Sequence, residues 1–360
     1  GIAEILKHWG LTVTGSDTTK SEITDKLVAQ GIPVIIGHDL DNVAKADVVV
    51  YSAAVKDDDP ELVKAKNLNI PIITRGTFLG KITKAFANSI CVSGTHGKTT
   101  TTSMISVCFL EAHKDPSIQV GAYLKQIDGN YRVGSSEYFI IEACEYVESY
   151  LKLFPKTEII LNIDEDHLDY FDNIDHIIRT FKGYVDNLRE SDYVVINIDD
   201  ENAKTLLPIE NCKVFTFGIK NHADLMAKNI EFNEEGFPTY DLYLKDEKVA
   251  HVELSVLGRH NILNSLAAIG AAYVNGISIE DSIAGLKSYK GVERRLEEKG
   301  FYKGAKVMDD YAHHPTEIKS SIHAIKNACK GKLYTVFQPH TFTRTKLLLD
   351  AFANSFDESD

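Results

Sequence analysis

The chain has 360 residues, and its 52 acidic residues outnumber its 39 lysines and arginines, which gives a formal net charge of −13. This length allows two or three domains with cores of their own. The negative charge argues against nucleic acid or an anionic membrane as a partner, so an anionic substrate needs basic residues gathered at its site. No apolar run reaches membrane-spanning length, and no signal peptide is visible.

The five cysteines are scattered along the chain, and none belongs to a C-x-x-C motif. An odd number of cysteines without motif spacing is typical of free thiols in a reducing compartment. We therefore expect a cytoplasmic protein whose thiols are unpaired. The sequence does not indicate an oligomeric state.

Residues 1–87 alternate short apolar stretches with helical patterns, which predicts an α/β domain with a parallel sheet. Helices are expected at 2–8, 22–30 and 60–67, and strands at 11–14, 33–36, 47–52 (of the fully buried type) and 71–74. Ligands of such sheets bind at the carboxyl ends of the strands, where Ser16, Asp17, His38 and Ser52 fall. Taken singly, each of these four is better explained as a cap or turn residue. Because the chain starts inside a predicted helix and stops just after another, we expect a fragment cut within a domain at each end.

The strongest motif is Gly94-Thr95-His96-Gly97-Lys98-Thr99-Thr100, between an apolar strand at 89–92 and a helix at 101–110. Strand, glycine turn, Lys-Thr and helix are typical of a phosphate-binding loop, in which backbone N–H groups and the helix N-terminus hold the anion. Lys98 can reach the outer phosphates, and the Thr99 hydroxyl can hold Mg²⁺. Val92 stands where the strict pattern has glycine, so the loop is a shorter variant. A simple strand-to-helix turn explains the four consecutive threonines poorly, so a nucleotide site is favoured.

Acidic residues follow two further strands of this second domain. The strand at 138–142 ends in Glu142-Ala-Cys144-Glu145, and the strand at 158–162 is followed by Asp164-Glu165-Asp166-His167-Leu-Asp169. Oxygen ligands beside a phosphate loop suit Mg²⁺. Glu142 is favoured over a solvated turn residue because it continues a buried apolar run. His167 stays open between ligand and turn residue, since Mg²⁺ prefers oxygen.

The rest of the second domain predicts strands at 193–197 and 213–217, hairpins within 225–254, a helix at 259–273 and a linker at 291–295. Asn261 and Asn264 open this helix three residues apart and therefore share one face. They suit contacts with a base or with a phosphate-bound water. Helix capping explains the spacing equally well.

A third unit begins near residue 296. A predicted strand at 305–308 ends in Asp309-Asp310-Tyr311-Ala312-His313-His314, and one at 333–337 ends in Gln338-Pro-His340. Helices are expected from Thr316 and over 344–356. His340 and Arg344 can bind a carboxylate or a phosphate. So many titratable groups favour a ligand face over a solvated turn.

These motifs, in this order, resemble the Mur ligase family over essentially the whole chain. The resemblance implies a UDP-substrate domain at 1–87, a central P-loop ATPase α/β domain at 88–292 and a C-terminal domain at 293–360. It also implies that the first and last domains are Rossmann-like and truncated. The family member that the motifs match best uses ATP and Mg²⁺ to phosphorylate the lactyl carboxylate of UDP-N-acetylmuramate, and L-alanine then attacks the acyl phosphate.

The resemblance also assigns residues by position. Lys98, Glu142, His167 and His313 match catalytic positions, and Thr99, Glu142 and His167 match the Mg²⁺ ligands. Nucleotide contacts match Gly94, Thr95, His96, Gly97, Lys98, Thr99, Thr100, Asn261, Asn264, Arg295 and Asp310. Substrate contacts match Tyr311, His313, His340 and Arg344. The strand-end residues Ser16, Asp17, His38 and Ser52 are expected to contact the substrate in the first domain. One departure matters: Cys144 stands where the family usually has an acid, which puts any metal or water role of that acid in doubt.

Three other functions remain open at this point. One is the recycling ligase of the same family, which attaches a tripeptide to the same sugar nucleotide, and a more distant one is a folylpolyglutamate-type ligase. From another class, a phosphate-loop switch that binds nucleotide and a partner protein leaves the acid- and histidine-rich segments of the third unit unexplained. Phosphate release that requires both the sugar nucleotide and an amino acid distinguishes a ligase from a switch.

Overall fold

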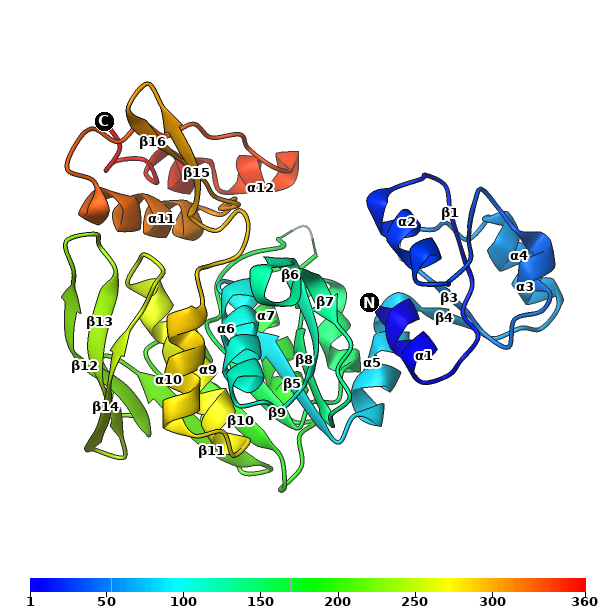
Figure 1. Cartoon of the computed structure of the whole chain (residues 1–360), viewed down its shortest axis with the longest axis horizontal. Helices are drawn as coiled ribbons and strands as arrows, with labels where there is room; N and C mark the ends of the chain where they lie inside the picture. The colour runs from blue at the N-terminus through cyan, green and yellow to red at the C-terminus, as the bar shows by residue number, and fades with distance from the viewer. Residues whose placement is uncertain (53, 169) are drawn as a thin grey trace. The chain divides into compact units, whose positions relative to one another are not determined.

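The computed structural model describes residues 1–52, 54–168 and 170–360, so Asp169 of the acidic motif lies outside the described residues. The chain divides into two compact units, Gly1–Ala85 and Phe86–Asp360 (Figure 1). Among the described residues, no helix combines the length and the apolar character needed to cross a membrane. The predicted boundary near residue 292 stays a proposal, because residues on both sides of it belong to the second unit.

The first unit contains two pairs of parallel strands, β1 with β2 and β3 with β4. Its elements are α1 (Ile2–His8), β1 (Gly15–Asp17), α2 (Glu22–Ala29), β2 (Val34–Ile36), α3 (Leu40–Val43), β3 (Val49–Tyr51), α4 (Pro60–Asn67), β4 (Ile72–Thr74) and α5 (Arg75–Ala85). The strand predicted at 11–14 is wrong: those residues form no strand, and β1 begins only at Gly15. The fully buried strand predicted at 47–52 is also wrong: β3 is half-buried, since it pairs with a single neighbour.

The second unit is built on a ten-stranded sheet in the order β14-β13-β12-β11-β10-β9-β5-β8-β6-β7. The strands from β12 through β6 run parallel, and antiparallel strands close both edges. The strands are β5 (Asn88–Ser93), β6 (Ser117–Leu124), β7 (Gly129–Arg132), β8 (Tyr138–Glu142), β9 (Thr157–Ile160), β10 (Tyr193–Asn197), β11 (Lys213–Gly218), β12 (Leu225–Phe232), β13 (Pro238–Leu244) and β14 (Glu247–Glu253). The strands, hairpins and helix predicted for this region are confirmed, within a few residues at their ends.

Helices α6, α9 and α10 contact one another, and their apolar side chains form one core with β5, β8 and β9 (Figure 1). The helices of this region are α6 (Lys98–Glu111), η1 (Lys125–Ile127), η2 (Tyr146–Lys152), α7 (Ile174–Val185), α8 (Glu201–Lys204), α9 (His260–Val274) and α10 (Ile279–Ser288). Burial of α6 is nearly complete, which explains how a run of threonines can be helical: packing overrides their weak helix propensity.

The segment after residue 293 contributes an antiparallel hairpin and three helices. They are β15 (Glu297–Tyr302), β16 (Ala305–Asp309), α11 (Pro315–Ala328), α12 (Phe342–Leu347) and α13 (Leu349–Ala353). The strand predicted at 333–337 is wrong: these residues are irregular, and Val336 is 98% exposed. No strand among the described residues pairs with them, so their apolar alternation has no sheet to join. The single helix predicted at 344–356 is likewise two helices, which meet at Leu348.

One buried group stands out in the sheet. Glu158 of β9 is fully buried beside Cys91, its register partner on β5, and near Tyr184 of α7. Neither carboxyl oxygen has a hydrogen-bond partner among the described residues. Burial raises the pKa of Glu158 well above its ordinary value. The folded chain therefore keeps a proton that the unfolded chain releases above about pH 4.3, and stability falls as the pH rises from there.

We predict that Glu158→Gln removes this pH dependence, because the amide has nearly the same shape and no charge to bury. At pH 8 the melting temperature of the variant should exceed that of the unsubstituted chain by roughly a few degrees. At pH 4, where both the folded and the unfolded chain hold the proton, the difference should nearly vanish. Glu253→Gln, an exposed position on β14, is the control. Parallel pH profiles of the melting temperature in variant and unsubstituted chain would contradict the prediction.

Candidate functional site

The turn from β5 into α6 brings the phosphate-loop motif to the carboxyl edge of the parallel strands. Gly94 and Gly97 have φ angles of 132° and 85°, which a side chain rarely allows. At Gly97 a Cβ atom would also lie 2.6 Å from Oδ1 of Asn264. The Asn162 side chain holds the loop on its other side, since it accepts from the His96 backbone N–H at 2.8 Å and donates to the His96 carbonyl at 3.0 Å. Glycine at both positions therefore lets the loop lie directly on β9 and α9.

Lys98 is folded back onto this loop. Its ammonium donates to the carbonyls of Gly94 at 2.5 Å and Thr95 at 3.0 Å, and it forms an ion pair with Glu145 at 2.9 Å. Burial alone lowers the pKa of Lys98, but the neighbouring acids, chiefly Glu145, outweigh burial and raise it. The lysine is therefore charged and lies where it can turn toward an anion held by the loop.

The next threonine and the end of β8 form an oxygen-rich group. The Thr99 hydroxyl donates to Glu142 at 3.1 Å, and the Gly121 backbone N–H donates to the other oxygen of the same carboxylate. Burial raises the pKa of Glu142, so a nearby cation would favour its charged form. Nε2 of His167 lies 3.9 Å from Glu145, whose side chain is 3% exposed. These donors fit a small hard cation, with the imidazole as the less usual ligand.

The two asparagines of α9 face the loop. Asn264 donates to Asn261 at 2.8 Å, and Asn261 donates to the carbonyl of Leu257 at 2.7 Å. His260 lies beside them, and burial, with a smaller effect of Arg295, lowers its pKa to about 4. A neutral imidazole and two amides therefore surround the loop, and they can accept and donate hydrogen bonds without adding charge.

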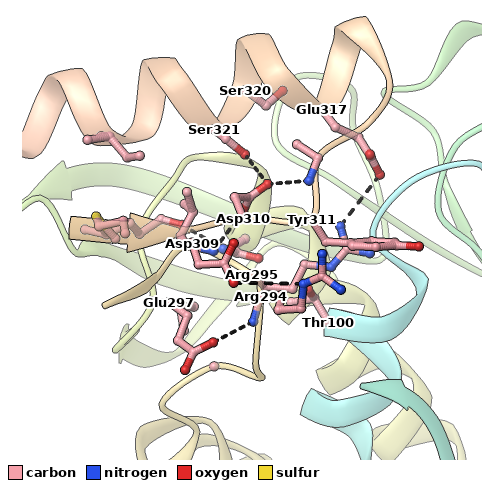
Figure 2. A pocket seen from close by; sticks show the side chains of 18 of the residues that line it. Thr100, Arg294, Arg295, Glu297, Asp309, Asp310, Tyr311, Glu317, Ser320 and Ser321 are labelled. Carbon is pink, nitrogen blue, oxygen red and sulfur yellow. Dashed lines mark hydrogen bonds and ion pairs between the residues drawn. The ribbon is translucent and has the colours of Figure 1, made fainter. Parts of the chain in front are cut away.

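The segment after residue 293 supplies a second face, which Figure 2 shows. The Asp310 carboxylate accepts from the backbone N–H groups of Leu296 at 2.8 Å and Ala312 at 2.7 Å. Burial raises its pKa. The guanidinium groups of Arg294 and Arg295 lie over the Tyr311 ring, at 4.7 and 5.5 Å from its centre. Asp310 thus fixes the turn that carries these cations.

Glu317 on α11 is a residue that the sequence did not single out as a site residue. Its carboxylate lies 3.4 Å from Nδ1 of His96, 3.8 Å from Arg295 and 3.5 Å from Nδ1 of His313. Burial raises the pKa of Glu317, but His96, Arg295 and His313 outweigh burial and hold it well below its ordinary range. In the sequence, Glu317 could have been found from its position in the first turn of a helix that directly follows two histidines.

Arg344 and His340 lie differently from each other. Arg344 donates from Nε at 3.0 Å and from Nη2 at 2.9 Å to one oxygen of Asp166, in a pair that is about nine-tenths buried on both sides. His340 is exposed, with its ring 6.5 Å from that of His313. In this structure the Arg344 guanidinium is ion-paired with Asp166. Its predicted substrate role stays a proposal.

A large cavity, about 2130 Å³, joins the two faces of the second unit. That volume exceeds what one small ligand needs and suits a nucleotide with further substrates. The predicted site residues that line it are His96, Gly97, Thr100, Asn261, Asn264, Arg295, Asp310, Tyr311, His313 and His340. Of the others, Lys98 and His167 each lie beside Glu145, and Thr99 contacts Glu142.

The four candidates in the first unit lie at strand ends, as predicted, and take part in local contacts. Ser16 donates to Glu61 at 2.6 Å, and His38 lies 4.0 Å from the same carboxylate. Asp17 and Ser52 accept from backbone N–H groups two residues further on. The contacts of Asp17 and Ser52 are turn contacts, whereas Ser16 and His38 contact Glu61 on α4. A substrate role for all four residues stays a proposal.

Comparison with known proteins identifies three family models along the chain. The description "Mur ligase family, catalytic domain" matches residues 1–87, "Mur ligase middle domain" matches 92–272, and "Mur ligase, glutamate ligase domain" matches 294–360. Together the three matches extend from the first residue to the last.

Among curated proteins, the chain is 49% identical to the UDP-N-acetylmuramate–L-alanine ligase of Acetivibrio thermocellus, over all of this chain and 77% of that protein. It is 47% identical to the protein of the same name from Clostridium perfringens, over 79% of its length. Among solved structures, the UDP-N-acetylmuramate-alanine ligase of Thermotoga maritima superposes with a TM-score of 0.82 at 28% identity, over all of this chain and 80% of that one. A murein peptide ligase from Psychrobacter arcticus gives 0.78 at 25%, with the same coverage.

The Asp166–Arg344 pair leads to a stability prediction. Arg344→Ala leaves a buried carboxylate without its cation, so we expect a loss of about 3 kcal/mol in unfolding free energy. Arg344→Lys keeps the charge but not the two-pronged contact, and should cost about 1 kcal/mol. Urea denaturation followed by circular dichroism measures both.

The control for this pair is Arg132→Ala, which breaks the more exposed pair between Arg132 and Asp115. A pair of that kind contributes about 1 kcal/mol or less. Equal losses for Arg344→Ala and Arg132→Ala would show that burial of the Asp166 pair has no energetic consequence.

Proposed function

The chain belongs to the Mur ligase family, and on that premise we propose that it is an ATP-dependent ligase that joins L-alanine to the lactyl carboxylate of UDP-N-acetylmuramate in peptidoglycan precursor synthesis. One structural observation carries the proposal: a glycine loop with Lys98 and Thr99 shares an edge with a carboxylate group, and a cavity connects it to the basic face of the last segment. Two relatives that share nearly half of their residues with this chain are named for this reaction.

The reaction consists of two displacements. The lactyl carboxylate attacks the γ-phosphorus of ATP, ADP leaves, and an acyl phosphate forms. The neutral amine of L-alanine then attacks the acyl carbon, inorganic phosphate leaves, and the amide forms as the amine loses a proton. Both steps need anions brought together, so the protein must supply fixed positive charge and correct orientation.

Lys98 and the N-terminus of α6 supply charge for the first step. The loop N–H groups and the helix dipole stabilise phosphate oxygens, and the Lys98 ammonium can exchange its contact with Glu145 for a phosphate. Because that contact already holds the lysine beside the loop, the exchange needs a side-chain turn rather than a backbone movement.

We propose that Thr99, Glu142 and His167 hold Mg²⁺, since their donors gather beside the loop. When bound, the ion neutralises phosphate charge and fixes the orientation of the transferred group. Glu142 contributes a carboxylate whose position is set by Thr99 and Gly121. His167 has a φ of 53°, a strained value that turns its ring toward Glu145 and Tyr146.

The second face would hold the anionic groups of the substrates. Arg295, His313 and His340 line the cavity and can pair with carboxylate or phosphate oxygens, and Tyr311 offers a hydroxyl beside them. We assign the UDP-sugar contacts at strand ends of the first unit to Ser16, Asp17, His38 and Ser52. Asn261 and Asn264 suit the nucleotide side of the cavity.

The alternatives are less well supported. Among solved structures, the murein peptide ligase gives a TM-score of 0.78 at 25% identity, against 0.82 at 28% for the alanine ligase. The curated relatives at 49% and 47% identity are both named for alanine. A nucleotide switch binds no second substrate, so it does not explain why Glu317, Arg295 and His313 are gathered in the cavity. The test is phosphate release from ATP, which should require both UDP-N-acetylmuramate and L-alanine, and should not occur when the tripeptide replaces alanine. Because the reaction consumes ATP and the five thiols are free, we also propose a cytoplasmic location.

We predict that Lys98→Ala lowers turnover by on the order of a hundredfold or more, because a charge that stabilises the transition state is lost. Phosphate release measures turnover, and a melting curve checks the fold. Lys156→Ala is a matched control, since Lys156 also pairs with a buried acid, Asp192, just before β9 begins. Near-normal turnover in Lys98→Ala would overturn the phosphate-loop assignment.

A second prediction concerns the metal. Glu142→Gln and His167→Asn should each raise the Mg²⁺ concentration needed for half-maximal activity, because each removes one ligand. The measurement is a Mg²⁺ titration of phosphate release at saturating substrates. His176→Asn, which alters an imidazole on α7 paired with Glu148, should leave the titration unchanged. Unchanged titrations in both ligand variants would place the metal elsewhere.

A further inference from the structure

The ring of His96 lies between carboxylates from two distant parts of the second unit. Nε2 is 3.1 Å from Asp164, which follows β9, and Nδ1 is 3.4 Å from Glu317 on α11. A neutral imidazole donates from one nitrogen and accepts at the other, so it cannot donate to both carboxylates. The imidazolium form carries a proton on both nitrogens and can donate to both carboxylates. It also places a positive charge in the phosphate loop.

Other groups around the ring agree with this charge state. The His314 ring lies 4.8 Å away, and burial together with the charge on His96 lowers the pKa of His314, so His314 is the neutral member of the pair. Burial lowers the pKa of His96, but Asp164 and Glu317 outweigh burial and raise it to about 9. Arg295 lies 3.8 Å from the same Glu317 oxygen that His96 contacts.

The contacts of His96 belong to a group of polar contacts, which we call the seam, between the first turn of α11 on one side and the phosphate loop and the residues after β9 on the other. The Thr316 hydroxyl donates to Asp164 at 2.9 Å, and Nε2 of His314 is 2.9 Å from the Glu165 carbonyl. Figure 2 shows Glu317 pointing from α11 toward Arg295. Because Glu317 contacts His96 and also Arg295 and His313, it connects the phosphate loop to residues proposed to hold the other substrates.

We propose that His96 is a positioning residue that acts as an imidazolium: it adds positive charge to the phosphate loop and couples nucleotide binding to α11 through Glu317. The inference rests on the proposed function, in that the ligand of the loop is a nucleoside triphosphate. Sequence reasoning placed His96 among loop residues that contact the nucleotide. The structure instead directs its side chain to two acids.

A dependence on pH follows. The ring is charged below about pH 9 and neutral above it. Since the folded pKa exceeds the ordinary value of about 6.5, the ring stabilises the folded chain fully below that pH and loses this effect as the pH rises through 9. Lys98 stays charged over this range because its pKa is raised above its own ordinary value. A step in nucleotide affinity near pH 9 therefore reports on His96.

The experiment is calorimetric titration of the full chain with a non-hydrolysable ATP analogue between pH 7.5 and 10. In the unsubstituted chain the dissociation constant should rise about tenfold through pH 9, because the loop loses one nearby positive charge and the charge-assisted contacts of His96 with Asp164 and Glu317 weaken. His96→Gln should bind about tenfold more weakly at pH 7.5 and show no step. Glu317→Gln should move the step to lower pH, because one carboxylate that stabilises the imidazolium is gone. His251→Gln, whose ring pairs with Asp241 on the outer hairpin, should behave like the unsubstituted chain.

Three results of the titration would overturn the proposal: no step in the unsubstituted chain, the same step in His96→Gln, or an unmoved step in Glu317→Gln. The last decides the matter alone if His96→Gln does not fold. Absence of any binding by the unsubstituted chain would count against the proposed function instead. Melting curves without nucleotide then test the seam, since the melting temperature should fall through pH 9 more steeply in the unsubstituted chain than in Glu317→Gln. Equal slopes would overturn the proposal.

Discussion

The site depends on the parallel register of three adjacent strands. In that register Ser93 of β5 lies opposite Ile160 of β9, and Val92 lies opposite Glu142 of β8. Parallel strands end at the same edge, so the glycine loop, the Glu142 carboxylate and the segment that starts at Asn162 meet there without any long connection. Backbone and side-chain hydrogen bonds from Asn162 then fix the loop in one position. The contacts that Lys98 and Glu317 make with the loop therefore depend on this edge of the sheet.

The cations of the site are already paired with acids. Lys98 contacts Glu145, His96 contacts Asp164 and Glu317, and Arg344 contacts Asp166. In a chain with a net charge of −13, this arrangement keeps the basic groups in place without a ligand. Binding of an anion is then an exchange of partners. Its free energy is the difference between two sets of charged contacts, and the acids that are released must stay solvated or paired elsewhere.

Local patterns in the sequence predict much of this structure. The strands and helices of the second unit follow from apolar runs bounded by glycine and polar residues, and the motifs fall at strand ends because the α/β alternation places them there. The phosphate loop is predictable in the same way, since it needs glycine at Gly94 and Gly97 for their backbone angles. These features depend on neighbours in the sequence.

The features that the sequence did not predict depend on distant partners. The contact of His96 with Glu317 joins the phosphate loop to α11, and no spacing in the sequence predicts it. Residues 333–337 have the pattern of a strand but lack a neighbouring strand among the described residues, so they stay irregular. The half-buried state of β3 has the same cause, because a run of valines predicts a strand but does not reveal how many strands cover it.

Cys144 shows how a departure from a family pattern can be understood from charge. An acid at this position would add a third carboxylate to Glu142 and Glu145, and Lys98 pairs directly with one of them. Cys144 is exposed, but desolvation of its thiol by the surrounding groups, with the charge of Glu145, raises the thiol's pKa, so it stays neutral and adds no charge. The edge that receives phosphate oxygens is therefore less negative than it would be with an acid, and the repulsion against an incoming nucleotide is smaller. The same replacement leaves Glu145 as the acid that pairs with Lys98, which is also held by the carbonyls of Gly94 and Thr95.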